Sequence, residues 1–299
     1  MTKTAIKKYE PLMNLKDVVT FYRSIGSLGE PSLFDTNFLV PTISSQIRKN
    51  GKRLITWNYL GEIQREMGKL YGLHHEKNFG LHPTELIEGK EYFSNLYFKV
   101  RELIEGAYFS LAELIANSEN VLITEEVKDE HNRDVCNIES LLGETANEYS
   151  RERISFELKQ KLKINNAFIE ADNSDRVVFG HRNSLEIMLG NYLMQFAKWN
   201  RYDVSEDDVA LVRRGIFRAL EKEEEHVIYT HDKELYDFVD AINRDKGCFR
   251  IVRSRYFSDS LSLVRVYWTS WSFDQKSFRR SFSENNNGAI VMPSDFNLV

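Results

Sequence analysis

Four acidic side chains stand where predicted strands end or predicted helices begin, and together they could hold a cation. We call them the four-acid group, and its members are Asp35, Glu130, Asp208 and Asp232. In a parallel sheet, such positions lie at the edge where ligands bind. Carboxylates crowded into one cleft repel one another, so some take up protons unless a cation neutralises them. Because every donor is an oxygen atom, the cation that fits is a hard divalent ion, Mg²⁺ or Mn²⁺.

Asp35 is the most informative member because it interrupts a run that is otherwise suited to burial, Leu33–Val40 (LFDTNFLV). An ionised carboxylate in apolar surroundings is costly unless it is paired, hydrogen-bonded or bound to a cation. A second interpretation stays open, in which the carboxylate accepts hydrogen bonds from backbone amides where a strand turns into a helix.

The other three acids also have local explanations. Glu130 shares a helix face with the glutamate four residues earlier and could be a solvated surface residue. Asp208 follows a serine by three residues, which is the spacing of a capping box. Thr230 could cap a helix, and Asp232 would then merely favour the N-terminus of that helix. Each acid taken singly is therefore compatible with a structural role.

Short apolar segments alternate with helical patterns along the chain, and this alternation predicts an α/β fold. The predicted strands are 33–40, 121–124, 226–230 and 249–252, with a fifth candidate at 261–268. Apolar residues recur at helical spacing over 92–115 and 185–199, and shorter helices follow Ser205 and Thr230. Strands that are separated by helices pair in parallel, so we expect a central parallel sheet flanked by helices.

The order of these motifs resembles that of the PIN-domain nucleases over residues 31–252. The motifs that carry the resemblance are Asp35-Thr36-Asn37, an acid after the second strand, Ser205 three residues before Asp208, and Thr230-His231-Asp232. The resemblance implies metal-dependent hydrolysis of phosphodiester bonds in RNA, leaving a 5′-phosphate and a 3′-hydroxyl. It also implies that Asp35 and Asp232 are the principal metal ligands, and that Glu130 and Asp208 complete the shell or orient the water. The neighbours expected to support them are Thr36, Asn37, Thr230, Asp207 and Glu126.

The chain departs from the family in one respect that affects its organisation. The interval between Asp35 and Glu130 is longer than in a compact PIN domain, which predicts a helical insertion at 53–118. Glu113 lies in a stretch similar to the acid-bearing helix of the family, but we reject it because no strand precedes it. The predicted organisation is an N-terminal helical extension (1–30), a PIN-like nuclease domain (31–252) and a basic-aromatic C-terminal extension with a tail (253–299).

The segment 244–282 is basic and rich in aromatic residues, which suits single-stranded nucleic acid. It contains nine Lys or Arg and three acidic residues, whereas the whole chain has a net charge of −5. The arginines expected to bind RNA are Arg250, Arg253, Arg255, Arg265, Arg279 and Arg280. The alternative is that the aromatic residues complete the core while the cations decorate its edge.

Composition excludes several classes of protein. Two cysteines among 299 residues are too few for a disulfide framework or a cysteine zinc site. No apolar run approaches the roughly 18–20 residues that a membrane span needs, so we expect a cytoplasmic protein without a membrane partner. The sequence also lacks the glycine-rich motifs of dinucleotide and nucleoside triphosphate sites.

Two other functions stay open from the sequence. A PIN-like fold whose acids do not catalyse would be an RNA- or protein-binding scaffold, because a fold does not determine a function. The same metal chemistry would also serve a structure-specific DNA nuclease. Besides RNA, the partners left open are an inhibitor protein and a second copy of the chain.

Overall fold

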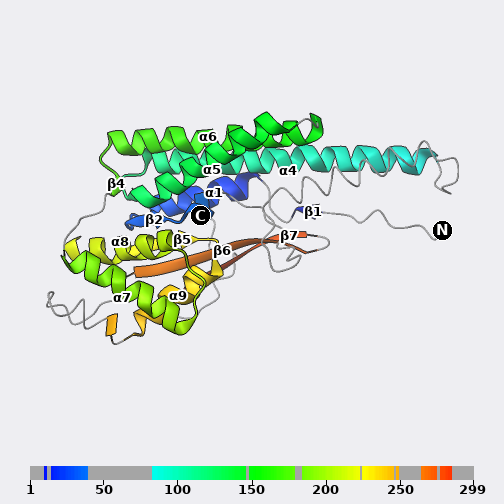
Figure 1. Ribbon diagram of the computed structural model, residues 1–299. Coiled ribbons are helices and arrows are strands. Elements are labelled where there is room, and N and C mark those ends of the chain that lie inside the picture. Colours follow the sequence, from blue (N-terminus) through cyan, green and yellow to red (C-terminus); the bar gives the residue numbers. More distant parts are fainter. Residues whose placement is uncertain are drawn as a thin grey trace. The chain divides into compact units, whose positions relative to one another are not determined.

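The computed structural model describes residues 10–11, 15–39, 83–145, 148–178, 184–222, 224–245, 247–248, 264–274 and 277–284 (Figure 1). The chain forms two compact units. The smaller unit comprises residues 1–20, 42–107 and 270–280, and the larger unit comprises residues 21–41, 108–269 and 281–299. All members of the four-acid group belong to the larger unit. These discontinuous units are a different partition from the three consecutive segments predicted above, whose boundaries stay predictions.

A parallel sheet forms the centre of the larger unit, so the predicted α/β fold class is confirmed and is consistent with a PIN-like fold. Its strands run in the order β6-β5-β2-β3-β4, and every neighbouring pair among them is parallel. The strands are β2 (Ser32–Phe34), β3 (Val121–Thr124), β4 (Val177–Val178), β5 (His226–Thr230) and β6 (Val264–Asp274).

The strand order reverses direction at β2, and this reversal defines the place where a ligand is expected. The chain adds β3 and β4 on one side of β2, then returns to add β5 and β6 on the other side. Leu33 in the middle of β2 is therefore paired with Leu122 of β3 and with Ile228 of β5. In open α/β sheets, ligands bind beyond the carboxyl ends of the strands at such a reversal. Here that position lies at the ends of β2 and β5.

The predicted strand 33–40 is wrong over residues 35–39, and Val40 lies outside the described residues. The backbone N–H of Asp35 donates to the carbonyl of Tyr229 (3.0 Å), and then helix α2 (Thr36–Leu39) begins. The backbone N–H groups of Phe38 and Leu39 donate back to the carbonyl of Asp35. The apolar residues after Asp35 are buried by helical spacing instead of by strand alternation, which a short apolar run does not distinguish.

The remaining strand predictions have three outcomes. The strands predicted at 121–124 and 226–230 are confirmed with the same bounds. The candidate at 261–268 corresponds to β6, whose described part begins at Val264, and the strand predicted at 249–252 lies outside the described residues. The two-residue strand β4, which pairs Val177 with Ile123, was too short to be predicted.

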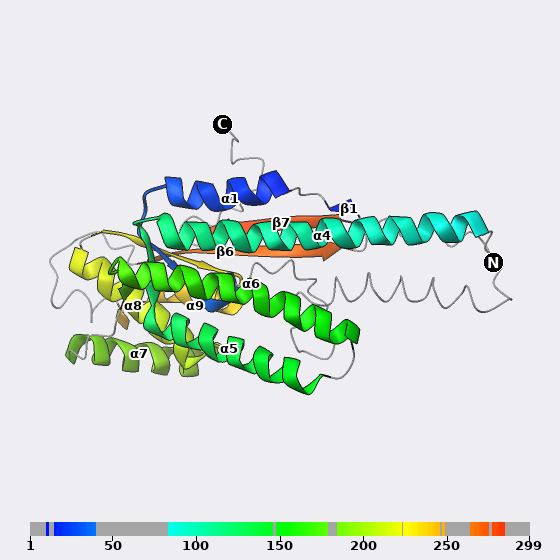
Figure 2. The same ribbon diagram turned by 90° about the horizontal axis from the view of Figure 1, so that it is seen from above.

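Most of the described larger unit is helical. Its helices include the C-terminal part of α4 (Pro83–Asn117) and the whole of α5 (Glu125–Glu144), α6 (Glu148–Asn173), α7 (Ser184–Asn200), α8 (Glu206–Lys222) and α9 (Lys233–Asn243). Figure 1 shows α5 and α6 on one side of the strands and α7 and α9 on the other. Figure 2 shows α5 and α6 running beside each other. The helices predicted at 92–115, at 185–199 and after Ser205 and Thr230 are confirmed, whereas α6 was not predicted.

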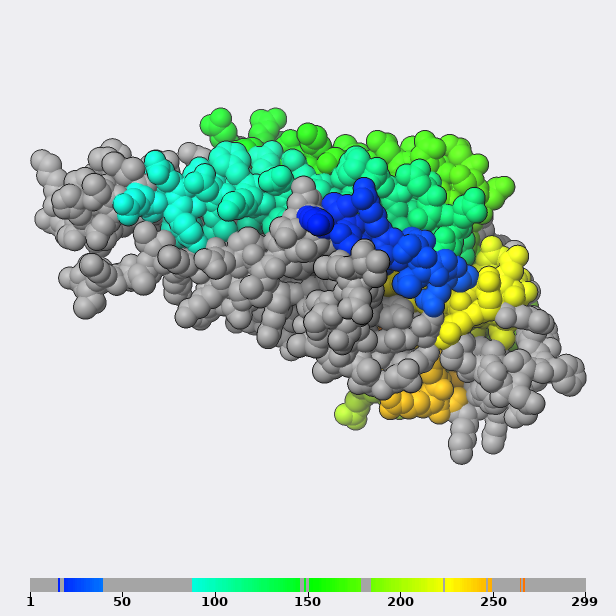
Figure 3. All heavy atoms as spheres, turned by 180° about the vertical axis from the view of Figure 1, so that it is seen from behind, coloured from blue at the N-terminus to red at the C-terminus, as the bar shows by residue number. Residues whose placement is uncertain are grey.

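Helix α1 (Leu15–Ser27) lies within the predicted N-terminal extension, but its second half belongs to the larger unit. Phe21 and Tyr22 are buried, and both rings contact the ring of Phe38 from α2 with centroid distances of 6.4 and 6.0 Å. Arg23 on the other side of the helix is exposed, and Figure 3 shows α1 at the surface. The helix thereby covers the apolar residues that follow Asp35.

The predicted helical insertion is described only from Pro83, where α4 begins. Arg176 binds the end of this helix, donating from its guanidinium to the carbonyls of Ile115, Ala116 and Ser118. A cation at a helix C-terminus satisfies carbonyls that lack intrahelical partners.

Among the helices in the described ranges, none is long and apolar enough to cross a membrane.

Candidate active site

Asp35 lies at the carboxyl end of β2, in the middle of the sheet edge. Its side chain is only 3 % exposed, and the hydroxyl of Thr230 donates to its Oδ2 at 2.6 Å. Thr230 is the last residue of β5 and is fully buried. The ends of the two strands that meet at the reversal are thus joined through a side-chain bond to the carboxylate.

The pKa of Asp35 is raised to about 8, and burial is the largest cause. The negative charges of the other three members of the four-acid group raise this pKa further, and the bond from Thr230 lowers it. Four acids that are far apart in the sequence therefore lie close enough to act on one carboxyl group. At neutral pH such a group is largely protonated unless a cation lies beside it.

Glu130 reaches the same edge from α5. The hydroxyl of Thr36, directly after Asp35, donates to Glu130 Oε2 at 2.5 Å. Burial raises the pKa of Glu130, the bond from Thr36 lowers it, and the charges of Asp207, Asp208 and a further acid on α5 raise it. The second residue of the D-T-N motif therefore positions the acid that follows the second strand.

Asp208 has the capping-box contacts that the sequence offered as its local explanation. Both the backbone N–H and the hydroxyl of Ser205 donate to Asp208 Oδ2 at 2.8 Å, and the N–H of Asp208 donates back to the Ser205 hydroxyl at 3.0 Å. Burial nevertheless raises the pKa of Asp208, against the lowering effect of Ser205, and the charges of Asp232 and Asp207 raise it further. The residue caps α8 and faces the other acids at the same time.

Asp232, and not Thr230, is the N-cap of α9, which corrects the cap considered from the sequence. Asp232 Oδ1 accepts from the backbone N–H of Glu234 at 2.8 Å. The N–H of Asp232 donates to the hydroxyl of Thr230 at 2.8 Å. Because the same hydroxyl donates to Asp35, Thr230 connects the two aspartates that were expected to be the principal metal ligands.

Of three further residues expected to support the site, two have ion-pair partners of their own and one is exposed. Asp207 binds Arg133, whose Nη2 lies 2.7 Å from Asp207 Oδ2. Glu126 binds the guanidinium of Arg214 at 2.7 Å, so it belongs to an ion-pair network one turn before Glu130. Asn37 is exposed on α2.

The structure describes only part of the segment that contains the arginines expected to bind RNA. Arg250, Arg253 and Arg255 lie outside the described residues. Arg265 belongs to β6, and Arg279 and Arg280 belong to β7 (Ser277–Glu284), but their side chains also lie outside the description. Their role stays a prediction.

Sequence reasoning missed a buried charged layer that adjoins Glu130 on α5. Lys161 of α6 lies 2.7 Å from Asp134 Oδ2, and its side chain is 4 % exposed. His131 is buried next to it, with Nε2 facing the carbonyl of Lys161 at 3.2 Å, and burial lowers its pKa to about 4. Asp134 follows Glu130 by four residues, so helical spacing was a signal that could have found this layer.

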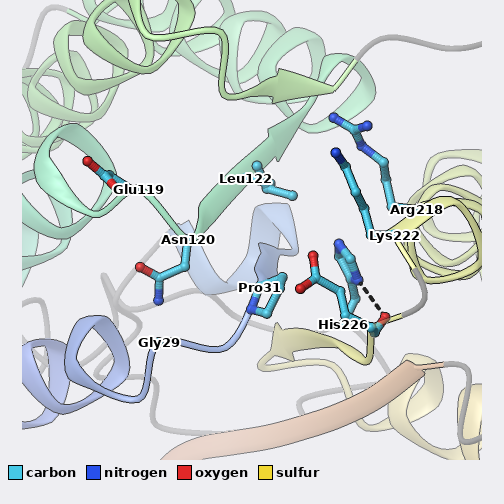
Figure 4. A pocket seen from close by; sticks show the side chains of 9 residues that line it. Gly29, Pro31, Glu119, Asn120, Leu122, Arg218, Lys222 and His226 are labelled. Carbon is cyan, nitrogen blue, oxygen red and sulfur yellow. Dashed lines mark hydrogen bonds between the residues drawn. The ribbon is translucent and has the colours of Figure 1, made fainter.

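A pocket of about 410 Å³ lies elsewhere in the larger unit (Figure 4). Pro31, Asn120 and His226 line it at the amino ends of β2, β3 and β5, the opposite sheet edge from the four-acid group. Arg218 and Lys222 extend from α8 on one side of it. No member of the four-acid group lines this pocket, so it is separate from the candidate site.

The spacing of the potential ligands bears on whether the four-acid group can hold a metal ion. Across the part of the chain that the structure describes, no three or more His, Cys, Asp or Glu side chains are grouped so that they could hold a metal ion. The four acids influence one another, and each has at least one oxygen in a hydrogen bond within the protein.

No family model, curated protein or solved structure matches this chain.

Proposed function

We propose that the chain is a metal-dependent ribonuclease of the PIN-like type and that the four-acid group is its active site. The observation that carries the proposal is the burial of Asp35 at the end of β2, where Thr230 binds both Asp35 and Asp232 and the adjacent Thr36 binds Glu130. Burial and the charges of the other three acids raise the pKa of Asp35 to about 8. Gathering like charges around a buried carboxylate opposes folding. Such an arrangement is typical of sites that work on a cation or a proton.

The donors of the four-acid group are carboxylate oxygens, which Mg²⁺ and Mn²⁺ prefer. Mg²⁺ keeps several of its waters and is usually bound through only one or two carboxylates together with substrate phosphates. A site without three directly grouped ligands is compatible with this mode of binding. Asp35 and Asp232 would hold the ion, with Glu130 and Asp208 completing its surroundings. When bound, such an ion neutralises phosphate charge and lowers the pKa of water.

The protein residues around the acids fix the orientation of the carboxylates before substrate arrives. Thr230 holds Asp35 through its hydroxyl proton and holds the backbone of Asp232 through its oxygen. Thr36 holds Glu130, and Ser205 holds Asp208. Pre-oriented polar groups contribute to catalysis because they need not reorganise during the reaction.

Glu130 is suited to accept a proton from the attacking water, because Asp35 and Asp232 are assigned to the ion and Asp208 is held by two hydrogen bonds from Ser205. Its pKa is raised by burial and by neighbouring acids, which brings it closer to neutral pH. A general base works best when its pKa is near the working pH. The water would then attack the phosphorus atom as its proton passes to Glu130, and the bond to the 3′-oxygen of the preceding nucleotide would break. That oxygen would take up a proton from solvent, leaving a 5′-phosphate and a 3′-hydroxyl.

Two observations favour a second function. The described residues contain no group of three potential ligands, and Asp208 and Asp232 have local roles as helix caps. A PIN-like scaffold that binds RNA or protein without cleaving it would need no more than this.

A cleavage assay separates the two functions. Full-length protein is incubated with labelled single-stranded RNA or DNA in Mg²⁺, Mn²⁺ or EDTA, next to Asp35→Asn and Asp232→Asn. The matched control is Glu113→Gln, an exposed acid on α4. The nuclease proposal expects metal-dependent RNA cleavage that both aspartate variants lose and the control keeps. Binding without cleavage in any divalent ion would support the scaffold, and preferential cleavage of DNA would assign the other substrate.

A further inference from the structure

Arg133 is an exposed cation at the border of the four-acid group. It lies on α5 three residues after Glu130, and its Nη2 is 2.7 Å from Asp207 Oδ2. The Arg133 side chain is 62 % exposed, and the Asp207 side chain is 37 % exposed. Most donors of this guanidinium therefore face solvent while one binds a carboxylate.

The partner of Arg133 belongs to the electrostatic surroundings of the site. Asp207 precedes Asp208 on α8, and its charge raises the pKa of both Glu130 and Asp208. Arg133 is therefore attached to a partly exposed acid whose charge acts on two members of the four-acid group.

The neighbouring cations are placed differently. Lys161 is buried in its pair with Asp134, and Arg214 is buried in its pairs with Glu126 and Glu186. Lys128, five residues before Arg133 on α5, binds Asp172 of α6. Among these cations, Arg133 alone combines solvent exposure with a contact to an acid of the site.

We propose that Arg133 is the residue that binds the phosphate next to the scissile bond, exchanging Asp207 for a non-bridging phosphate oxygen of RNA. The inference rests on the proposed function. An exposed ion pair is weak and easily exchanged, and the planar guanidinium fits phosphate as well as carboxylate.

The exchange of Asp207 for phosphate should also change the binding of the divalent ion. When the arginine moves to phosphate, Asp207 loses its compensating charge and adds a negative charge to the site. RNA and the divalent ion should then strengthen the binding of each other, because coupling between two ligands is reciprocal.

Two variants that break the same ion pair should have opposite effects, and this contrast is the test. Arg133→Gln removes the phosphate donor, so the affinity for single-stranded RNA should fall about three- to tenfold and the salt dependence should lose about one phosphate contact. Asp207→Asn frees the arginine, so the affinity should rise. Lys128→Gln, which breaks an exposed pair away from the site, should change the affinity by less than about twofold.

Binding is measured by fluorescence anisotropy of a labelled RNA oligonucleotide on the full chain, in EDTA and in an Asp35→Asn background with Mn²⁺. Equal losses in Arg133→Gln and Asp207→Asn would show a merely structural pair and overturn the inference, as would the absence of RNA binding in both buffers. If Asp35→Asn abolishes cleavage but Arg133→Gln binds RNA normally, only the inference fails. If no divalent ion supports cleavage while the opposite effects are observed, only the proposed function fails.

Discussion

Helix α5 carries two glutamates on one face whose surroundings are opposite in charge. Glu126 is bound by Arg214 at 2.7 Å and lies 3.7 Å from Arg213, and both arginines also pair with the buried Glu186 of α7. Glu130, one turn later, accepts a hydrogen bond from the neutral hydroxyl of Thr36, and the negative charges of Asp207, Asp208 and Asp134 act on it. The fold thus neutralises one carboxylate with guanidinium groups and surrounds the other with further negative charge.

The neighbouring helices therefore do not lack cations that could neutralise the four-acid group. Arginines are available on α8 only a few residues after Asp208, and they are directed to Glu126 and Glu186 instead. Asp35, Glu130 and Asp208 accept hydrogen bonds from hydroxyl groups, although arginines lie on the same helix as Asp208. This is the arrangement expected when a bound external cation neutralises the acids.

Removing an arginine from the ion pairs of Glu126 and Glu186 should have the largest effect on stability. Arg214→Leu leaves Glu186, whose side chain is 2 % exposed, without its principal partner. Removing one member of a buried ion pair costs about 3–5 kcal/mol, so the free energy of unfolding should fall by that amount in urea titrations followed by circular dichroism.

The control for this variant is Arg133→Gln, which breaks an exposed arginine–aspartate pair and should cost less than about 1 kcal/mol. Replacing Arg214 and Glu186 together by leucine should recover much of the loss, since the unpaired charge is then gone. Equal effects of Arg214→Leu and Arg133→Gln would contradict the distinction between the two regions.

Removing a charge from the four-acid group should change the free energy of unfolding less than Arg214→Leu does, and it should raise that free energy. The folded pKa of Asp35 is about 8, above its ordinary value of 3.8. The folded state therefore binds more protons than the unfolded state between these values, and the metal-free protein loses stability as pH rises through this range.

Asp35→Asn removes this loss, so at pH 8 in EDTA its free energy of unfolding should exceed that of the parent by about 1 kcal/mol or more. The difference should disappear towards pH 4. Glu113→Gln should follow the parent at every pH. A strongly destabilised Asp35→Asn protein would instead assign the carboxylate a structural role.

The comparison also shows how far the sequence could predict this molecule. The strands at 121–124 and 226–230 were predictable because compact apolar runs there end at a threonine. Residues 36–39 were wrongly included in a strand, because Phe38 is buried equally well by a helical turn against α1. Helix α6 was missed because buried polar residues such as Lys161 interrupt its apolar spacing.

The candidate site was predictable in its acids but not in their partners. Asp35 was noticeable as a charge within an apolar run, and Thr230 and Asp232 as the end of a buried strand. The contact between Arg133 and Asp207 joins residues 74 positions apart, and the ion pairs of Glu126 and Glu186 with the two arginines of α8 join three helices. Only the tertiary arrangement determines which charges meet, because local spacing contains no information about helices that pack from distant parts of the chain.

The central claim is that the four-acid group holds a divalent cation, and calorimetric titration of Mn²⁺ into the full-length protein near neutral pH tests it most directly. We predict saturable binding that Asp35→Asn and Asp232→Asn each weaken at least about tenfold, a loss of about 1.4 kcal/mol, and that Glu113→Gln retains. A parent protein that binds no Mn²⁺, or an Asp35→Asn protein that binds it as tightly as the parent, would contradict the claim.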